Sequence, residues 1–154
     1  MEPRSFSGLD VRQIATNGTI LHVRVGGQGP ALVMLHGFGD TGDMWRPLAD
    51  ALADKHGRHP RSARHGSFRA RRSRLHEKET SLDIAGVLNN LRIEKADLVT
   101  HDIGNMVGYA FAAQFPDRVT SWVAMDAPLP GIGNWEQIAR DPRLWHFNFR
   151  GPDA

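Results

Sequence analysis

Strand-like and helix-like segments alternate along this chain of 154 residues, and the alternation constrains the fold more than any other feature. The continuous apolar run at 31–37 is typical of a strand buried on both faces, and further strands are predicted at 96–100 and 119–125. Apolar residues recur at helical spacing in the segments 45–52, 84–91 and 104–114. Because strands that alternate with helices build βαβ units, the sequence predicts an α/β domain with a mostly parallel sheet.

Three short signals place the ends of these elements. Asn17-Gly18 lies between two β-rich runs and predicts a hairpin at the start of the sheet. Pro47 suits the first turn of a helix, where its missing N–H costs least. Ser81 is predicted to be the N-cap of the helix that follows it.

Composition excludes several classes of protein. A chain of this length with 40% hydrophobic residues can bury one core, which favours a single domain. The absence of cysteine excludes disulfide scaffolds, thiol nucleophiles and thiolate metal sites. No apolar run approaches the roughly 18 residues that a membrane helix needs, and the N-terminus lacks a signal-peptide pattern. We therefore expect a cytoplasmic protein with no membrane partner, no cofactor and no metal.

Residues 57–76 break the alternation. They hold seven arginines and no acid, and the rest of the chain then has 12 Lys and Arg against 17 Asp and Glu. Such a tract could make the chain a non-catalytic module that binds nucleic acid. The tract lacks the interleaved aromatic residues on which bases stack, so a nucleic-acid partner is not expected.

The most specific motif lies at 98–119. An apolar run leads into His101 and Asp102, turns at Gly104 and continues as a helix, with no serine or cysteine near the turn. Short residues occupy the positions two before, two after and three after the aspartate, namely Thr100, Gly104 and Asn105. Taken alone, the aspartate could be a helix N-cap. Small neighbours also let a strained turn lift one side chain above a sheet, which would expose this carboxylate.

This turn resembles the nucleophile elbow of the α/β-hydrolase family, and the segment LHGFGDTGDMW at 35–45 resembles the oxyanion loop of that family. An aspartate in the elbow narrows the resemblance to epoxide hydrolases and to haloalkane and haloacetate dehalogenases. The resemblance implies that Asp102 is a nucleophile that attacks carbon and forms an alkyl-enzyme ester. It also implies that the backbone N–H groups of Phe38 and Ile103 hold the oxyanion.

The resemblance also divides the chain. Residues 1–128 correspond to the N-terminal part of the hydrolase core, and residues 129–154 correspond to the start of the helical cap. In the family the triad acid and the water-activating histidine lie beyond the cap, so we expect a truncated hydrolase that is incomplete for turnover. Asp126 follows a predicted strand, where it could be mistaken for the triad acid, and is interpreted as a loop anchor.

Further residues are candidates for the substrate pocket or for the core. The predicted pocket residues are His36, Gly37, His101, Trp145 and His146. His36 and His101 could instead be structural groups that bond to the backbone. Trp145 and His146 could belong to an amphipathic cap helix. The aromatic residues assigned to the core are Trp45, Phe111, Phe115 and Trp122.

The expected substrate is a small neutral electrophile. Haloacetate dehalogenases place an arginine directly after the nucleophile, where this chain has Ile103. Their cap pairs histidine with tryptophan, where this chain has His146-Phe147. Both departures favour an epoxide, and a haloalkane or haloacetate dehalogenase-like hydrolase is the alternative.

The family has its fourth strand and a following loop where the arginine tract lies, with a pattern such as Val-Val-Ile-Pro-Asp-Leu-Arg-Gly-Met-Gly-Leu-Ser. If the codons allowed for 57–68 are read one base later, the shifted codons permit this pattern, including Asp-Leu-Arg-Gly-Met-Gly at 61–67. We predict that a segment of about 55–80 is translated out of frame between two compensating indels, or reflects a sequencing error. The fourth strand would then be lost, which would separate the N-terminal hairpin from the sheet and leave the chain marginally stable.

Overall fold

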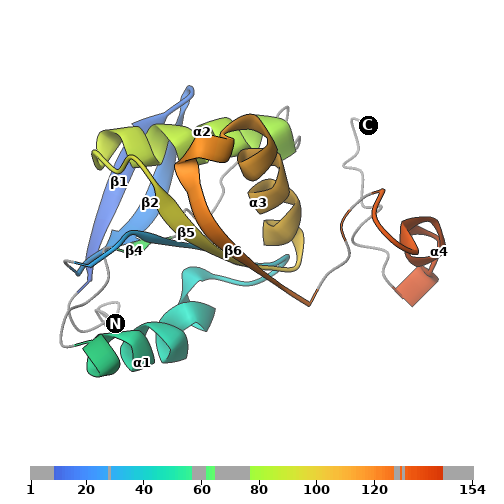
Figure 1. The fold of residues 1–154 in the computed structure, drawn as a ribbon, viewed down its shortest axis with the longest axis horizontal. Helices are drawn as coiled ribbons and strands as arrows, with labels where there is room; N and C mark the ends of the chain where they lie inside the picture. Colours follow the sequence, from blue (N-terminus) through green and yellow to red (C-terminus); the bar gives the residue numbers. More distant parts are fainter. Residues whose placement is uncertain are drawn as a thin grey trace.

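The computed structural model of the protein describes residues 9–27, 29–56, 62–64, 77–126, 129 and 131–143. Within these residues the strands form one six-stranded sheet in the order β1-β2-β4-β3-β5-β6 (Figure 1). The strands are β1 (Asp10–Thr16), β2 (Thr19–Val25), β3 (Leu32–Leu35), β4 (Ser62–Arg64), β5 (Ala96–His101) and β6 (Val119–Met125). The pairs β3·β4, β3·β5 and β5·β6 are parallel, which confirms the predicted α/β sheet.

The first two strands form the predicted hairpin. β1 pairs antiparallel with β2 over its whole length, from Asp10 opposite Val25 to Thr16 opposite Thr19. Asn17 and Gly18 between them have φ values of 42° and 76°. A two-residue type I′ turn needs positive φ at both central positions, and an Asn-Gly pair meets that need at little cost.

The expected loss of the fourth strand is wrong. β4 lies between β2 and β3, where it pairs in parallel with residues 32–34 and antiparallel with Arg24. Ladder hydrogen bonds are made by the backbone, so a Ser-Ala-Arg segment can pair although it lacks the β-branched residues that favour strands. The hairpin is therefore joined to the sheet, whose edges in the described part of the chain are β1 and β6. The rest of the basic tract lies outside the described residues, and the frame shift stays a prediction.

Helices cover both faces of the sheet (Figure 1). α2 and α3 pack together on one face, and α1, preceded by the short turn η1, lies on the other. The turn η2 leads from α3 into β6, and α4 follows the sheet. The bounds are η1 (Gly42–Trp45), α1 (Arg46–His56), α2 (Glu77–Asn90), α3 (Ile103–Gln114), η2 (Pro116–Arg118) and α4 (Trp135–Ala139).

The predicted N-cap role of Ser81 is wrong, because α2 begins four residues earlier, at Glu77. The residues Glu-Lys-Glu that precede Thr80 are good helix formers and extend the helix upstream. Ser81 is fully buried; its Oγ donates to the Lys78 carbonyl over 2.7 Å and accepts a hydrogen bond from Gln114 of α3. Its role is to join two helices rather than to begin one.

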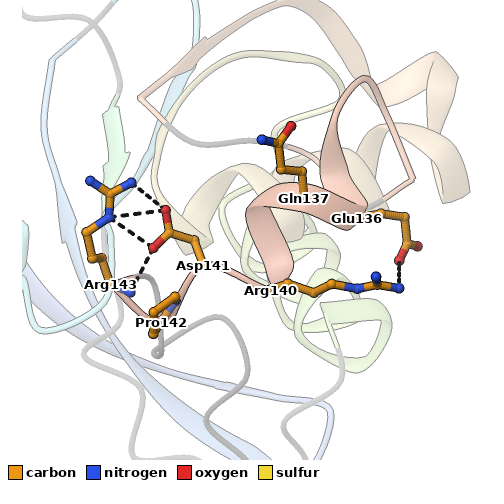
Figure 2. Close-up of a pocket in the computed structure, with 6 residues that line it drawn as sticks. All are labelled: Glu136, Gln137, Arg140, Asp141, Pro142 and Arg143. Atoms are coloured by element: carbon orange, nitrogen blue, oxygen red, sulfur yellow. Dashed lines mark hydrogen bonds and ion pairs between the residues drawn. The ribbon is translucent and has the colours of Figure 1, made fainter.

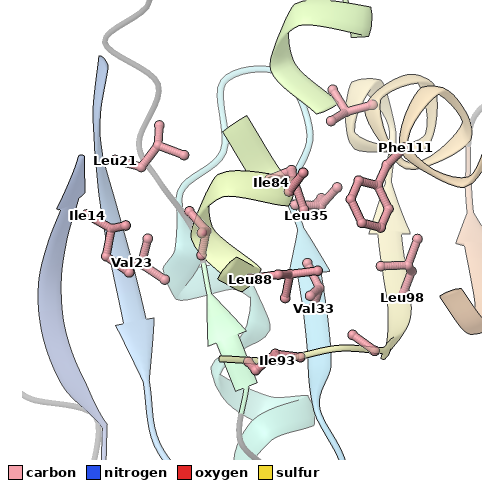
Figure 3. Packing of buried hydrophobic residues seen from close by; sticks show 14 residues of the cluster. Ile14, Leu21, Val23, Val33, Leu35, Ile84, Leu88, Ile93, Leu98 and Phe111 are labelled. Atoms are coloured by element: carbon pink, nitrogen blue, oxygen red, sulfur yellow. The ribbon is translucent and has the colours of Figure 1, made fainter. Parts of the chain in front are cut away.

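Buried apolar side chains join the hairpin, the parallel strands and the two packed helices into one core (Figure 3). The labelled members are Ile14, Leu21, Val23, Val33, Leu35, Ile84, Leu88, Ile93, Leu98 and Phe111. A smaller cluster around Met34, Trp45 and Ala49 lies under α1. Phe111 and Trp45 are buried as predicted, while Phe115 and Trp122 are partly buried and pack against the larger cluster. The core on both faces fixes the strand ends at which the site is built.

Candidate active site

Asp102 joins β5 to α3 in a strained turn. Its φ of 53° and ψ of −126° lie in a region that residues with a side chain rarely adopt. Such a conformation costs on the order of 1–3 kcal/mol and persists only where the surrounding structure enforces it. The turn lies at the carboxyl end of a central parallel strand, which is where open α/β sheets place their ligand sites.

Two glycines leave the space that this turn needs. A Cβ on Gly37 would lie 2.7 Å from the Cβ of Asp102 and 2.9 Å from its Oδ2. A Cβ on Gly104 would lie 2.7 Å from the Leu35 carbonyl oxygen and 2.8 Å from that of His36. Real Cβ atoms essentially never make contacts this short, so both positions require glycine for the loop after β3 to approach the elbow.

One backbone N–H contacts the carboxylate, and a second lies at the start of the helix beside it. The N–H of Phe38 donates to Asp102 Oδ2 over 2.9 Å. Ile103 is the first residue of α3, so its N–H belongs to the four at a helix start that have no partner within the helix. The helix start also carries the positive end of the helix dipole, which favours an anion at Asp102. The structure thus brings together the two predicted oxyanion residues and the predicted nucleophile.

The two predicted pocket histidines differ in their contacts. His36 Nδ1 donates to the Gly37 carbonyl over 2.8 Å, which matches the predicted structural role. The alternative, structural role predicted a backbone bond for His101 as well, but its ring lies between two carboxylates. Its Nδ1 is 3.7 Å from Asp40 Oδ2 and its Nε2 is 3.9 Å from Asp126 Oδ2, both too long for hydrogen bonds.

Asp126 does not behave as a loop anchor. It follows the end of the neighbouring strand β6 with a positive φ of 50°, and its side chain is 93% exposed. The hydrogen bonds of the described residues include none to this carboxylate, whereas an anchor would be bonded and buried. Asp126 thus presents a second acid at the same edge of the sheet as Asp102, which the interpretation from sequence had set aside.

Residues 129–154, predicted to begin the cap, are only partly described. Trp145 and His146 lie outside the described residues, so their predicted place in a pocket has no structural account. Six residues around α4 line an open hollow (Figure 2): Glu136, Gln137, Arg140, Asp141, Pro142 and Arg143. Hydrogen bonds from the side chain and then the backbone N–H of Arg143 lower the pKa of Asp141 to about 2. None of the six residues belongs to the elbow.

Two negative findings apply to the described residues. No group of three or more His, Cys, Asp or Glu side chains among them could hold a metal ion. None of their helices is long and apolar enough to cross a membrane.

Comparison with known proteins gives the family context. A family model described as the alpha/beta hydrolase fold matches residues 30–151. An epoxide hydrolase of Caballeronia sordidicola is 35% identical over 157 residues, covering 96% of this chain and 48% of that protein. A fluoroacetate dehalogenase of Burkholderia sp is 26% identical over 159 residues, covering 94% of this chain and 50% of that protein.

A solved structure supports the same fold. Cfl2 of Burkholderia cenocepacia matches with a TM-score of 0.79 and 26% identity, covering 96% of this chain and 53% of that chain. The chain spans about half the length of the curated relatives it matches.

Proposed function

The chain belongs to the α/β-hydrolase family, and from this premise we propose that it carries the nucleophile of an epoxide hydrolase-like site. Asp102 attacks a carbon atom of a small neutral epoxide and forms an alkyl-enzyme ester. One observation carries the proposal: a carboxylate in a strained turn with its Oδ2 aligned by the Phe38 N–H. Epoxide hydrolases among the relatives add support.

The proposed step needs no base. A carboxylate is an anion at pH 7 and is a nucleophile without deprotonation. Its oxygen forms a bond to carbon with its own electron pair, the carbon–oxygen bond of the ring breaks, and the resulting alkoxide takes a proton from water. After the attack, the N–H groups of Phe38 and Ile103 stabilise the negative charge that develops on the ester oxygen when water attacks it.

Dehalogenation is the second candidate, because a fluoroacetate dehalogenase is among the relatives. The same oxygen would then displace halide from carbon. The residue after the nucleophile is Ile103, which has no charge to bind a substrate carboxylate. We therefore favour a neutral substrate, and an epoxide over an alkyl halide.

Intact-mass measurement tests the proposal. Incubation with a small aryl epoxide is expected to add one epoxide mass to the protein, and Asp102→Asn is expected to abolish the adduct. Asp117→Asn, an exposed aspartate in η2, is the matched control and should keep the adduct. An adduct that survives Asp102→Asn would refute the proposal, and a stronger adduct with a small alkyl halide would favour the second candidate.

A further inference from the structure

A buried chain of hydrogen bonds lies behind the elbow and joins β5, β6 and α3. Trp122 Nε1 donates to Thr100 Oγ1 over 2.8 Å, and Thr100 Oγ1 donates to Asn105 Oδ1 over 2.5 Å. Asn105 Nδ2 donates in turn to the Met125 carbonyl over 2.9 Å. The side chains of Thr100 and Asn105 are fully buried. This series of hydrogen bonds therefore begins and ends on β6 and passes through β5 and α3, the two elements that meet at Asp102.

The chemistry of these groups fixes the direction of the chain. The Met125 carbonyl can only accept, so the amide nitrogen of Asn105 faces it and the amide oxygen faces Thr100. The Thr100 hydroxyl therefore donates to Asn105, and one of its lone pairs accepts the indole N–H of Trp122, which can only donate. Met125 thus sets the orientation of the Asn105 amide, and Trp122 holds the hydroxyl that donates to it.

Asn105 holds Asp102 on both of its peptide groups. The Met125 carbonyl that accepts from Asn105 Nδ2 also accepts the N–H of Asp102 over 3.2 Å. The backbone N–H of Asn105 donates to the Asp102 carbonyl over 2.8 Å. The residue in the strained conformation is thus bonded at its N–H to a carbonyl that Asn105 orients, and at its carbonyl to Asn105 itself.

We propose that Asn105 is a positioning residue that keeps Asp102 in the strained conformation, with Trp122 supporting it through the Thr100 hydroxyl. The proposal rests on the proposed nucleophilic role of Asp102. Burying two polar side chains in a core is costly, since each must be hydrogen-bonded to avoid a desolvation penalty. Their connection to the one strained residue at the site gives them a role beyond packing. Gly108 leaves room for them, because a Cβ there would lie 2.9 Å from Thr100 Cγ2.

Asn105→Asp is the main test, because it keeps the shape of the side chain and the acceptor for Thr100 while it removes the donor to Met125. We expect the amide of Asp102 to exchange hydrogen at least about tenfold faster. We also expect the maximal rate of adduct formation with an aryl epoxide to fall by about tenfold or more, with an unchanged half-saturating concentration, because geometry rather than substrate binding is lost.

Trp122→Phe is the second variant and keeps the ring while it removes one N–H. It should shift both measurements in the same direction by a smaller factor, and it stays informative if Asn105→Asp does not fold. Phe115→Leu, at the opposite end of α3, is the control for lost stability. The proposal would be overturned if Phe115→Leu, at the same unfolding free energy as Asn105→Asp, changed the Asp102 amide exchange and the adduct rate equally. It would also be overturned if Asn105→Asp left the exchange of the Asp102 amide unchanged. If the wild-type chain forms no adduct, the nucleophile proposal fails, whereas amide exchange still decides the role of Asn105.

Discussion

At the scale of the residue, Asp102 shows how the chain keeps an unfavourable conformation. Its strain is offset by the hydrogen bonds on its two peptide groups and by glycines that let the loop after β3 come close. The N–H of Phe38 reaches the carboxylate only because Gly37 has no side chain. Reactivity at Asp102 should therefore depend on residues that never touch a substrate.

Gly37→Ala should lower the rate of adduct formation by about 10- to 100-fold, because its Cβ would displace the carboxylate of Asp102 from the Phe38 N–H. Overpacking of this kind also costs about 1–3 kcal/mol of unfolding free energy. Time-resolved intact mass and a denaturant titration measure the two effects. An adduct rate within a factor of two of wild type would contradict the steric argument.

At the scale of the element, the sequence predicted what depends on local pattern. The three-residue strand β4 could not be predicted, because backbone pairing with β2 and β3 holds it although its side chains do not favour a strand. The neighbours of His101 come from two loops far away in sequence. In contrast, residues that are adjacent in sequence determine the geometry of the Asn17-Gly18 hairpin and of the turn at Asp102, and both were predicted.

Gly86→Ala should loosen the contact between α2 and the hairpin without affecting the nucleophile. A Cβ on Gly86 would lie 1.7 Å from Thr16 Oγ1, which donates to the Asp83 carbonyl over 3.3 Å. We expect a loss of about 1–3 kcal/mol in unfolding free energy. Thr16→Ala removes the clashing atom, so the double variant should be less destabilised than the sum of the two single variants. Strict additivity would show that the clash is not the cause.

The pairing of Asp141 with Arg143 after α4 should give a measurable titration. Because the folded-state pKa of Asp141 is lowered from 3.8 to about 2, its contribution to stability is present above pH 3.8 and is lost as the pH falls toward 2. The carboxyl carbon of Asp141, followed by NMR, should titrate near pH 2. In Arg143→Gln the pKa should rise toward 3.8, and an unchanged titration would rule out Arg143 as the cause.

At the scale of the whole molecule, the arginine tract differs from the rest of the chain in its positive charge and in its lack of strand or helix periodicity. The sheet nevertheless has the strand β4 in this region. We expect the gene to encode Asp-Leu-Arg-Gly-Met-Gly in the shifted frame opposite residues 61–67. Nucleotide sequencing from well before codon 55 to past codon 82 checks this, and codons that do not spell the motif would refute it.

The 154-residue chain should stop at the ester and produce no diol over many turnovers. Hydrolysis needs a histidine that activates water and is oriented by a short hydrogen bond to a carboxylate. His36 donates to a carbonyl, and the carboxylates beside His101 are more than 3.6 Å away, so neither histidine at the elbow meets that need.

Added imidazole should therefore speed the loss of the adduct, and the exposed carboxylate of Asp126 should assist it. Asp126→Asn should lower the imidazole-dependent rate and leave adduct formation unchanged, whereas sustained diol production without imidazole would show that the chain already contains a competent base.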